Sequence, residues 1–439
     1  MQRYLHALIA LIAFSSRPAL AQESPRRIID VTNPEFRSYA IAIPFVKAEA
    51  GAEAPAKDLT DQLRWNLGAS ALFRVLDPKS FLADPIKEGI TAPTIRFEDW
   101  LNVGAEGLIK GGVQIGPAMQ VVLRFFDVAS GRQLLEKKYE GSPEQAKSFA
   151  DDFSNAVVEL LTGTRGVFGT KIAAVRKLKS GREIWVIGMD GSGARPVTSN
   201  GAINMLPAWF ADGRSLLFTS IQNHNPNMYR VPADGGRPAV LSSQPGLNAG
   251  GAVSPDGSRI ALTMTRDGNS EIYTMSPDGS ALTRLTDHWA IDSSPTWSPD
   301  GQRIAFVSAR FGDPHIFIMN ADGTNLQRLT DRGNYNQTPD WSPRGNLIVF
   351  TARDERNVFD LFTVDPNTRE IRRLTQDQGN NEEPSFSPDG QHIVFTSTRE
   401  GSSQLWIMAV DGTKQLRLTQ EGGYLTPDWS PRALSGAAP

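Results

Sequence analysis

The sequence has no cysteine and only five histidines among its 439 residues. Without cysteine the chain forms no disulfide, carries no lipid on an N-terminal cysteine and offers no thiolate to a metal. An excess of positive charge is also missing. Loss of the leader described below, with Arg3 and Arg17, would change the formal net charge from −3 to −5. The composition therefore gives no basic surface for nucleic acid.

Long apolar runs are missing beyond the first residues. The apolar stretch 4–14 follows a basic residue and precedes Ala19 and Ala21, which have the spacing of an A-x-A cleavage site. This pattern predicts a secretory signal peptide over residues 1–21, with Gln22 as the first mature residue. The stretch is too short to span a bilayer as a permanent anchor. We therefore expect an exported, soluble product that is not embedded in the membrane.

What the sequence does have is a repeat. A proline, an intervening residue, an aromatic and a tight turn recur, as in Pro295-Thr296-Trp297-Ser298-Pro299-Asp300-Gly301. The residue before the turn glycine, or its equivalent, stands at positions 212, 256, 300, 344, 389 and 432, with spacings of 44, 44, 44, 45 and 43. One degenerate copy has Gly250 to Val253 in place of the proline and aromatic. A period of 40 to 50 residues is typical of solenoids and propellers.

Each copy is predicted to hold four short strands. Ser-Pro-Asp-Gly favours a tight turn, because proline fixes φ, serine suits the first turn position and glycine the last. A second Asp-Gly turn between apolar runs indicates a hairpin. The runs, such as residues 303–307, are rich in β-formers and too short for helices. Four-stranded units at this period predict a β-propeller.

The two ends of the repeat complement each other. Residues 169–175 match the second strand of a unit but lack the preceding first strand, whereas residues 427–431 are a first strand with no unit after them. We expect the C-terminal strand to complete the first blade, which would give six blades and remove an exposed sheet edge.

Residues 35–165 have a different pattern. Residues 37–45 are predicted as a strand, 58–72 as a helix, and 119–127 with 133–139 as a hairpin. Ser142 and Gln145 form a capping-box pattern before a helix that begins at Ala146, and Gly163 ends it. The expected fold class is α+β multi-domain, with a small N-terminal α/β domain followed by a six-bladed β-propeller closed by a C-terminal strand. The expected divisions are 1–21 signal peptide, 22–34 mobile segment, 35–165 α/β domain, 166–432 propeller and 433–439 tail.

A leader, a small α/β domain and Pro-x-Trp-Ser-Pro-Asp-Gly copies, in this order and without cysteine, together resemble the TolB family, periplasmic proteins of the Tol-Pal system of Gram-negative bacteria. The resemblance covers essentially the whole chain. It implies a scaffold with no cofactor, expected to be monomeric. The implied partners are the Pal lipoprotein, TolA and other outer-membrane or peptidoglycan-associated proteins, in a role in outer-membrane integrity and envelope constriction during cell division.

An enzymatic alternative finds little support. The chain has no G-x-S-x-G elbow, and the histidines of the mature chain stand at different phases of the repeat, so they predict no shared metal or acid–base centre. The recurring tryptophans allow two interpretations, a ligand-binding set or packing between blades. Their strict phase favours packing.

The segments before each innermost strand vary while the framework repeats. Variable loops on a rigid scaffold tend to carry binding residues, and aromatics suit protein interfaces; ordinary solvated turns are the alternative. These segments would converge on one mouth of the channel, where the resemblance places Pal. Acidic residues there, including Asp340, Glu383 and Asp428, have no fixed ligand spacing, so no metal site is predicted. The expected Pal-binding residues are Met205, Asn248, His288, Trp289, Asp292, Ser293, Tyr335, Asn336, Asn380, Glu382 and Tyr424.

The mature N-terminus is the second candidate site. Its strand-forming stretch is similar to the segment that engages TolA in the family, by strand addition or a comparable fit; a simple mobile terminus is the alternative. A switch is implied if Pal binding changes whether this segment is free. A rival of another class is a periplasmic propeller enzyme or a module binding sugars or other small molecules in the channel. The expected TolA-binding residues are Arg26, Arg27, Ile28, Ile29, Asp30 and Val31.

Overall fold

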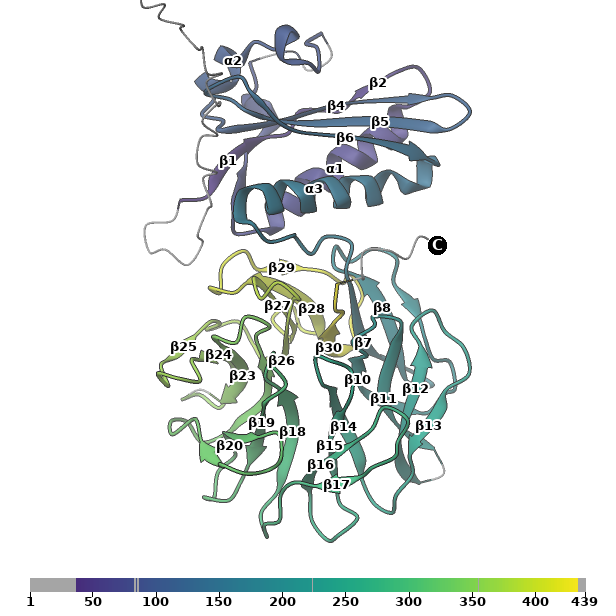
Figure 1. Ribbon diagram of the computed structural model, residues 1–439, viewed down its shortest axis with the longest axis vertical. Helices are drawn as coiled ribbons and strands as arrows, with labels where there is room; N and C mark the ends of the chain where they lie inside the picture. Colours follow the sequence, from purple (N-terminus) through teal and green to yellow (C-terminus); the bar gives the residue numbers. More distant parts are fainter. Residues whose placement is uncertain (1–36, 83, 85–86, 223, 354, 433–439) are drawn as a thin grey trace, which may run out of the picture.

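The computed structural model describes residues 37–82, 84, 87–222, 224–353 and 355–432, which form a small α/β domain and a β-propeller (Figure 1). The predicted signal peptide with Ala19, Ala21 and Gln22, the predicted TolA-binding stretch Arg26 to Val31 and the tail 433–439 all lie outside the described residues. Among those residues, no helix combines the length and apolar character needed to cross a membrane.

A mixed sheet forms the first domain, in the order β3-β1-β4-β5-β6 with β2 beside β4. Parallel pairs join β1 to β3 and β4 and join β2 to β4, whereas β4, β5 and β6 form an antiparallel meander. Its strands are β1 (Tyr39–Ala42), β2 (Lys47–Ala48), β3 (Phe73–Val75), β4 (Gly107–Ile115), β5 (Met119–Asp127) and β6 (Gln133–Gly141). The predicted hairpin at 119–139 is confirmed.

Two long helices lie on the sheet face that is turned toward the propeller (Figure 1). The helices are α1 (Glu53–Ala69), α2 (Phe97–Asn102) and α3 (Ala146–Thr162), with short 3-10 turns η1 (Pro78–Ser80), η2 (Ala92–Thr94) and η3 (Pro143–Gln145). The predicted capping box of Ser142 and Gln145 is confirmed, as is the left-handed end of α3 at Gly163, with φ of 75°. Helix α1 begins five residues before the predicted start and ends three residues before the predicted end, because Ser70 is already extended.

Four separate sheets of four antiparallel strands form most of the propeller. Their strands are β14 (Asn248–Val253), β15 (Ile260–Met264), β16 (Glu271–Met275), β17 (Thr283–Arg284); β18 (Asp292–Trp297), β19 (Arg303–Ser308), β20 (His315–Asn320), β21 (Gln327–Arg328); β22 (Asn336–Trp341), β23 (Ile348–Arg353), β24 (Phe359–Val364), β25 (Ile371–Arg373); β26 (Asn381–Phe386), β27 (His392–Ser397), β28 (Gln404–Ala409), β29 (Leu416–Arg417).

The remaining eight strands share one sheet in the order β13-β12-β11-β10-β8-β7-β30, with β9 beside β8. Between β10 and β8 only one residue pair is in register, Ile203 with Arg182. These strands are β7 (Lys171–Leu178), β8 (Gly181–Gly188), β9 (Arg195–Pro196), β10 (Ile203–Trp209), β11 (Ser215–Gln222), β12 (Asn225–Pro232), β13 (Ala239–Ser242) and β30 (Tyr424–Trp429).

The C-terminal strand pairs with the first propeller strand, as predicted. Strand β30 runs antiparallel to β7 with Trp429 opposite Ile172 and Asp428 opposite Ala173. One apolar cluster includes Leu63 and Phe153 of the first domain together with Ile172 and Trp429, so the closure lies where the two domains pack.

Candidate functional site

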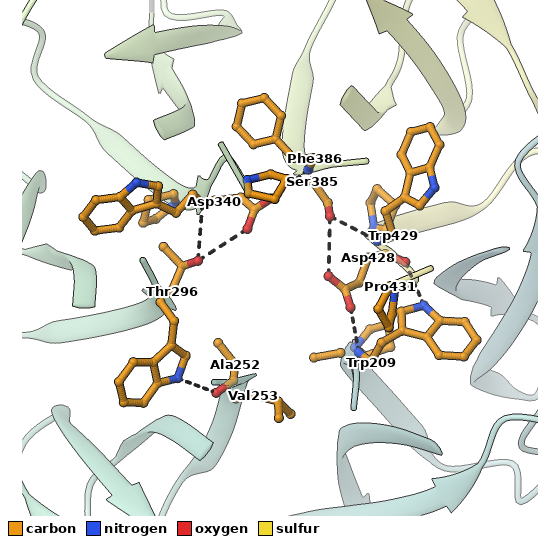
Figure 2. A pocket seen from close by; sticks show the side chains of 18 of the residues that line it. Trp209, Ala252, Val253, Thr296, Asp340, Ser385, Phe386, Asp428, Trp429 and Pro431 are labelled. Carbon is orange, nitrogen blue, oxygen red and sulfur yellow. Dashed lines mark hydrogen bonds between the residues drawn. The ribbon is translucent and has the colours of Figure 1, made fainter. Parts of the chain in front are cut away.

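The six innermost strands line a central channel with a cavity of about 560 Å³ (Figure 2). Each of these strands has a bulge at the same phase, where its register against the next strand shifts. The bulged residues have φ between 43° and 60°, the left-handed region: Leu206, Gly250, Ser294, Thr338, Glu383 and Thr426. Only one of the six is glycine. A bulge changes the direction of the side chains that follow it. These strained residues therefore determine which side chains of the innermost strands face the channel.

The residue between the proline and the aromatic faces the next blade. At four junctions it is polar and accepts a hydrogen bond from the backbone N–H of the next innermost strand (Figure 2). The acceptor–donor distances are 2.7 Å from Asp340 to Phe386, 2.7 Å from Asp428 to Trp209, 3.1 Å from Ser385 to Trp429 and 3.4 Å from Thr296 to Trp341. Ala208 and Ala252 hold the other two positions and offer no side-chain acceptor.

Three carboxyl groups on the innermost strands have raised pKa values. Burial raises the pKa of Asp340 to about 6. Burial, together with the charge of Asp340, raises the pKa of Asp428 to about 7. Burial and the neighbouring Glu383 raise the pKa of Glu382 to about 7. No lysine or arginine contributes to these three shifts, so each group keeps its proton to a higher pH than an ordinary carboxyl group does.

The polar side chains around the cavity are carboxyl, hydroxyl and indole groups. The residues around the cavity include no histidine, and the chain has no cysteine, so neither can serve as a base or nucleophile there. Within the described ranges, no group of three or more His, Cys, Asp or Glu side chains could hold a metal ion. What the channel can do is hydrogen-bond and exchange protons.

The recurring tryptophans are buried, as the packing interpretation predicted. Trp209, Trp297, Trp341 and Trp429 are each about one-twentieth exposed. Their indole N–H groups are also satisfied: that of Trp297 donates to the carbonyl of Ala252 at 3.0 Å, and that of Trp429 to the hydroxyl of Thr170 at 2.8 Å. Their role is therefore structural.

Three predicted partner-binding residues are buried, and they stand at one phase of the repeat. Asn336 is hydrogen-bonded to His315 at 3.0 Å and Thr330 at 2.9 Å. Asn248 accepts from Ser242 at 2.7 Å, and Asp292 accepts from Arg310 at 2.7 Å. The equivalent Asn204 and Asn381 are likewise buried. Asn248 and Asn336 join their innermost strands to the preceding blade, whereas Asp292 is paired within its own blade. These buried side chains offer no surface to a partner.

A fourth predicted residue, Tyr424, is also buried, because the Arg176 guanidinium lies 5.2 Å from its ring centroid and Trp185 packs at its edge. The signal that could have separated these four from true surface residues is their constant position before each Pro-x-aromatic copy. Met205, Ser293, Tyr335, Asn380 and Glu382 are half-buried.

One predicted residue is well exposed, and the structure adds two others. Trp289 lies on the connection from β17 to β18, next to the half-buried His288, and is 79% exposed. Ile291, on the same connection, is 56% exposed, and Phe311, between β19 and β20, is 69% exposed. A hydrogen bond of 3.1 Å from the Ala309 N–H to the Ile291 carbonyl joins the two connections. We call Trp289, Ile291 and Phe311 the apolar corner. Phe311 was not predicted, because only the segments before the innermost strands were considered as binding loops.

Comparisons with known proteins agree on both domains. A family model described as the TolB beta propeller domain matches residues 158–360 and 354–435, and one described as the TolB amino-terminal domain matches residues 27–134. The Tol-Pal system protein TolB of Anaeromyxobacter dehalogenans (strain 2CP-1) is 44% identical over 222 residues, 50% of this chain and 51% of that protein. That of Desulfosudis oleivorans is 38% identical over 218 residues, 49% and 50% of the two chains.

These alignments span about half the length of the curated relatives. A crystal structure of TolB from Acinetobacter baumannii is similar over more of the chain. It has a TM-score of 0.79 and 25% identity, and it covers 90% of this chain and 98% of its own.

Proposed function

The chain belongs to the TolB family of the Tol-Pal system, and from this premise we propose that it is a periplasmic, non-catalytic scaffold. It binds the Pal lipoprotein at the mouth of the propeller and TolA through its N-terminal segment. In this role it supports outer-membrane integrity and envelope constriction during cell division. The predicted leader, cleaved before Gln22, would deliver it to the periplasm.

We infer a ring of six blades. The eight-stranded sheet then counts as two blades, β30-β7-β8-β9 and β10-β11-β12-β13, since a single residue pair connects them. This division puts one four-stranded unit at each copy of the repeat. The proposed domain boundary lies between residues 165 and 166, after α3 and before β7.

The apolar corner is the observation that carries the proposed partner surface. Three large apolar side chains, all more than half exposed, lie on two joined loops of a rigid framework. Exposed apolar patches rimmed by polar groups mark interaction sites, and tryptophan is enriched among residues that dominate binding energy. His288, with its ring 5.3 Å from that of Trp289, extends the patch.

Titration calorimetry with the mature protein and the soluble domain of Pal tests this surface. Trp289→Ala should weaken binding by 2 kcal/mol or more, about 30-fold, as for a dominant interface residue. Val240→Ala is the matched control, because Val240 is also more than half exposed but lies on β13, an outer strand. Equal affinities for all three proteins would remove the apolar corner from the Pal surface, and no binding by the wild type would refute the partner.

The proposed TolA site is tested separately. Deleting residues 22–33, which include Arg26 to Val31, should abolish binding of the TolA domain and leave Pal binding intact. If the two sites are coupled, saturating Pal should change the affinity for TolA by about 1–3 kcal/mol. Retained TolA binding by the truncated chain would refute the assignment, and identical affinities with and without Pal would refute the switch.

A further inference from the structure

A second cavity, of about 280 Å³, lies between the two domains. The first domain contributes mostly apolar side chains from the ends of α1 and α3 and the chain that follows α3, and the propeller contributes polar side chains from two of its turns. The residues that matter here are Leu72, Val158, Phe168, Arg344, Asp389 and His392.

His392 is the unusual member. It is only 3% exposed, and neither ring nitrogen has a hydrogen-bond partner among the described residues. The nearest carboxylate oxygen, of Asp389, is 3.8 Å from Nδ1, which is too long for a hydrogen bond. The ring is held in place beside Trp429, with the centroids 6.2 Å apart. Buried polar atoms are nearly always paired, so two free nitrogens in one cavity point to a missing partner.

The repeat explains why the space is there. His392 occupies the first position of the second strand in its unit, where two other copies have Arg259 and Arg303. Those guanidinium groups lie over Trp297 and Trp341, at 4.7 and 4.9 Å from the ring centroids. The imidazole is shorter, so it reaches the equivalent Trp429 but leaves room under the first domain.

Charge and polarity decide what could fill that room. The cavity has one carboxylate, Asp389, and one guanidinium, Arg344, whose Nε donates to the backbone carbonyl of Asp389 at 2.7 Å. The described side chains of the first domain that line the cavity carry no charge. A charged ligand would therefore find no net counter-charge and would lose its hydration, which favours a neutral one.

An imidazole offers a hydrogen-bond donor in either protonation state and, in its neutral form, an acceptor as well, and a hydroxyl group can match either of them. The opposite wall, with Leu72, Val158 and Phe168, suits an apolar body. We propose that this cavity binds a small neutral hydroxyl compound, with its hydroxyl on His392 and its apolar body against the first domain. The volume suits one substituted ring, since a cavity of about 150 Å³ holds benzene. Such a ligand would touch both domains and stabilise their packing. The inference is independent of the proposed partners.

The matched probes are p-cresol and toluene, which differ by one hydroxyl. Binding to the mature wild-type protein is measured by ligand-observed NMR titration. We expect p-cresol to bind about tenfold more tightly than toluene, the worth of one net hydrogen bond. His392→Phe should abolish that preference. His224→Asn is the control, because His224 is exposed and its positive φ of 69° suits asparagine, and it should keep the preference.

Three titration results would each overturn the proposal. The first is no binding of p-cresol at millimolar concentration, the second is equal binding of both probes, and the third is an unchanged preference in His392→Phe. Should that variant not fold, the wild type still decides: intermolecular NOEs between p-cresol and the methyl groups of Val158 and Val167 place the ligand in this cavity. A folded wild type that binds p-cresol without those NOEs holds it elsewhere, which also overturns the proposal.

Discussion

Replacing Asp428 by asparagine should stabilise the protein, and more so at higher pH. The pKa of Asp428 is raised to about 7, with burial as the main cause and the charge of Asp340 in addition. An unfolded aspartate has a pKa of about 3.9. The folded state therefore binds the Asp428 proton more tightly than the unfolded state does. The stability that this proton contributes is complete below about pH 4 and is lost as the pH rises to 7.

The magnitude follows from the two pKa values. Their separation of about 3 units, at 1.36 kcal/mol each, makes the charged carboxylate cost at most about 4 kcal/mol above pH 7. At pH 5 the corresponding cost is about 1.5 kcal/mol. Screening by solvent would lower both costs. Asparagine can keep the hydrogen bond from the Trp209 N–H, 2.7 Å in the wild type, and carries no charge. We therefore expect Asp428→Asn to gain about 1–3 kcal/mol more at pH 8 than at pH 5.

Urea denaturation of the mature protein at several pH values, followed by tryptophan fluorescence, measures this difference. Asp256→Asn is a control of opposite sign. Hydrogen bonds from the Ser254 hydroxyl, and from the Ser258 backbone and hydroxyl, lower the pKa of Asp256 to about 2, so its contribution is present above about pH 4 and is lost as the pH falls to 2. A gain for Asp428→Asn that does not change between pH 5 and pH 8, or a loss at pH 8, would refute the reasoning.

Three further outcomes concern stability. Ser385→Ala removes the acceptor of the Trp429 N–H, and the orphaned donor should cost about 1–3 kcal/mol in urea denaturation; no loss would show that water replaces the hydroxyl. Asn336→Ala breaks buried bonds to His315 and Thr330 and should cost a similar amount, whereas Ser293→Ala, at a half-buried position, should cost less than 1 kcal/mol. Deleting residues 424–439 removes β30 and exposes β7, so differential scanning calorimetry should show no cooperative propeller transition; an unchanged transition would contradict closure.

The features that sequence analysis predicted well are those set by neighbouring residues. The turn glycine Gly301 has φ of 67°, and its N–H bonds to the carbonyl of Ser298 at 2.9 Å. The capping box of Ser142 and Gln145 spans four residues. Pairing of β30 with β7 is not local, but the repeat made it predictable, because an incomplete first unit and an unpaired last strand complete each other.

Long-range side-chain contacts were beyond the same reasoning. Asp292 stands in a variable segment with acidic residues, yet Arg310 pairs with it inside the blade. Asn336 is buried by contacts to His315 and Thr330 of the preceding blade. The apolar corner depends on one backbone hydrogen bond between loops some twenty residues apart. In each case the sequence shows the residue type, while the fold decides whether the side chain faces solvent or another part of the propeller.

The degenerate copy shows how the ring tolerates loss of its motif. It has glycine at the left-handed position, Gly251 in place of proline and Ala252 in place of a polar residue, and its neighbour Ala208 also lacks an acceptor. A Cβ on Gly251 would lie 2.4 Å from a methyl group of Leu217, so the glycine lets the neighbouring blade pack closely. Leu217 belongs to an apolar cluster shared by both blades. On this arc, apolar packing thus replaces the hydrogen bonds that a polar side chain accepts at the other junctions, while the indole of Trp297 still donates to the carbonyl of Ala252.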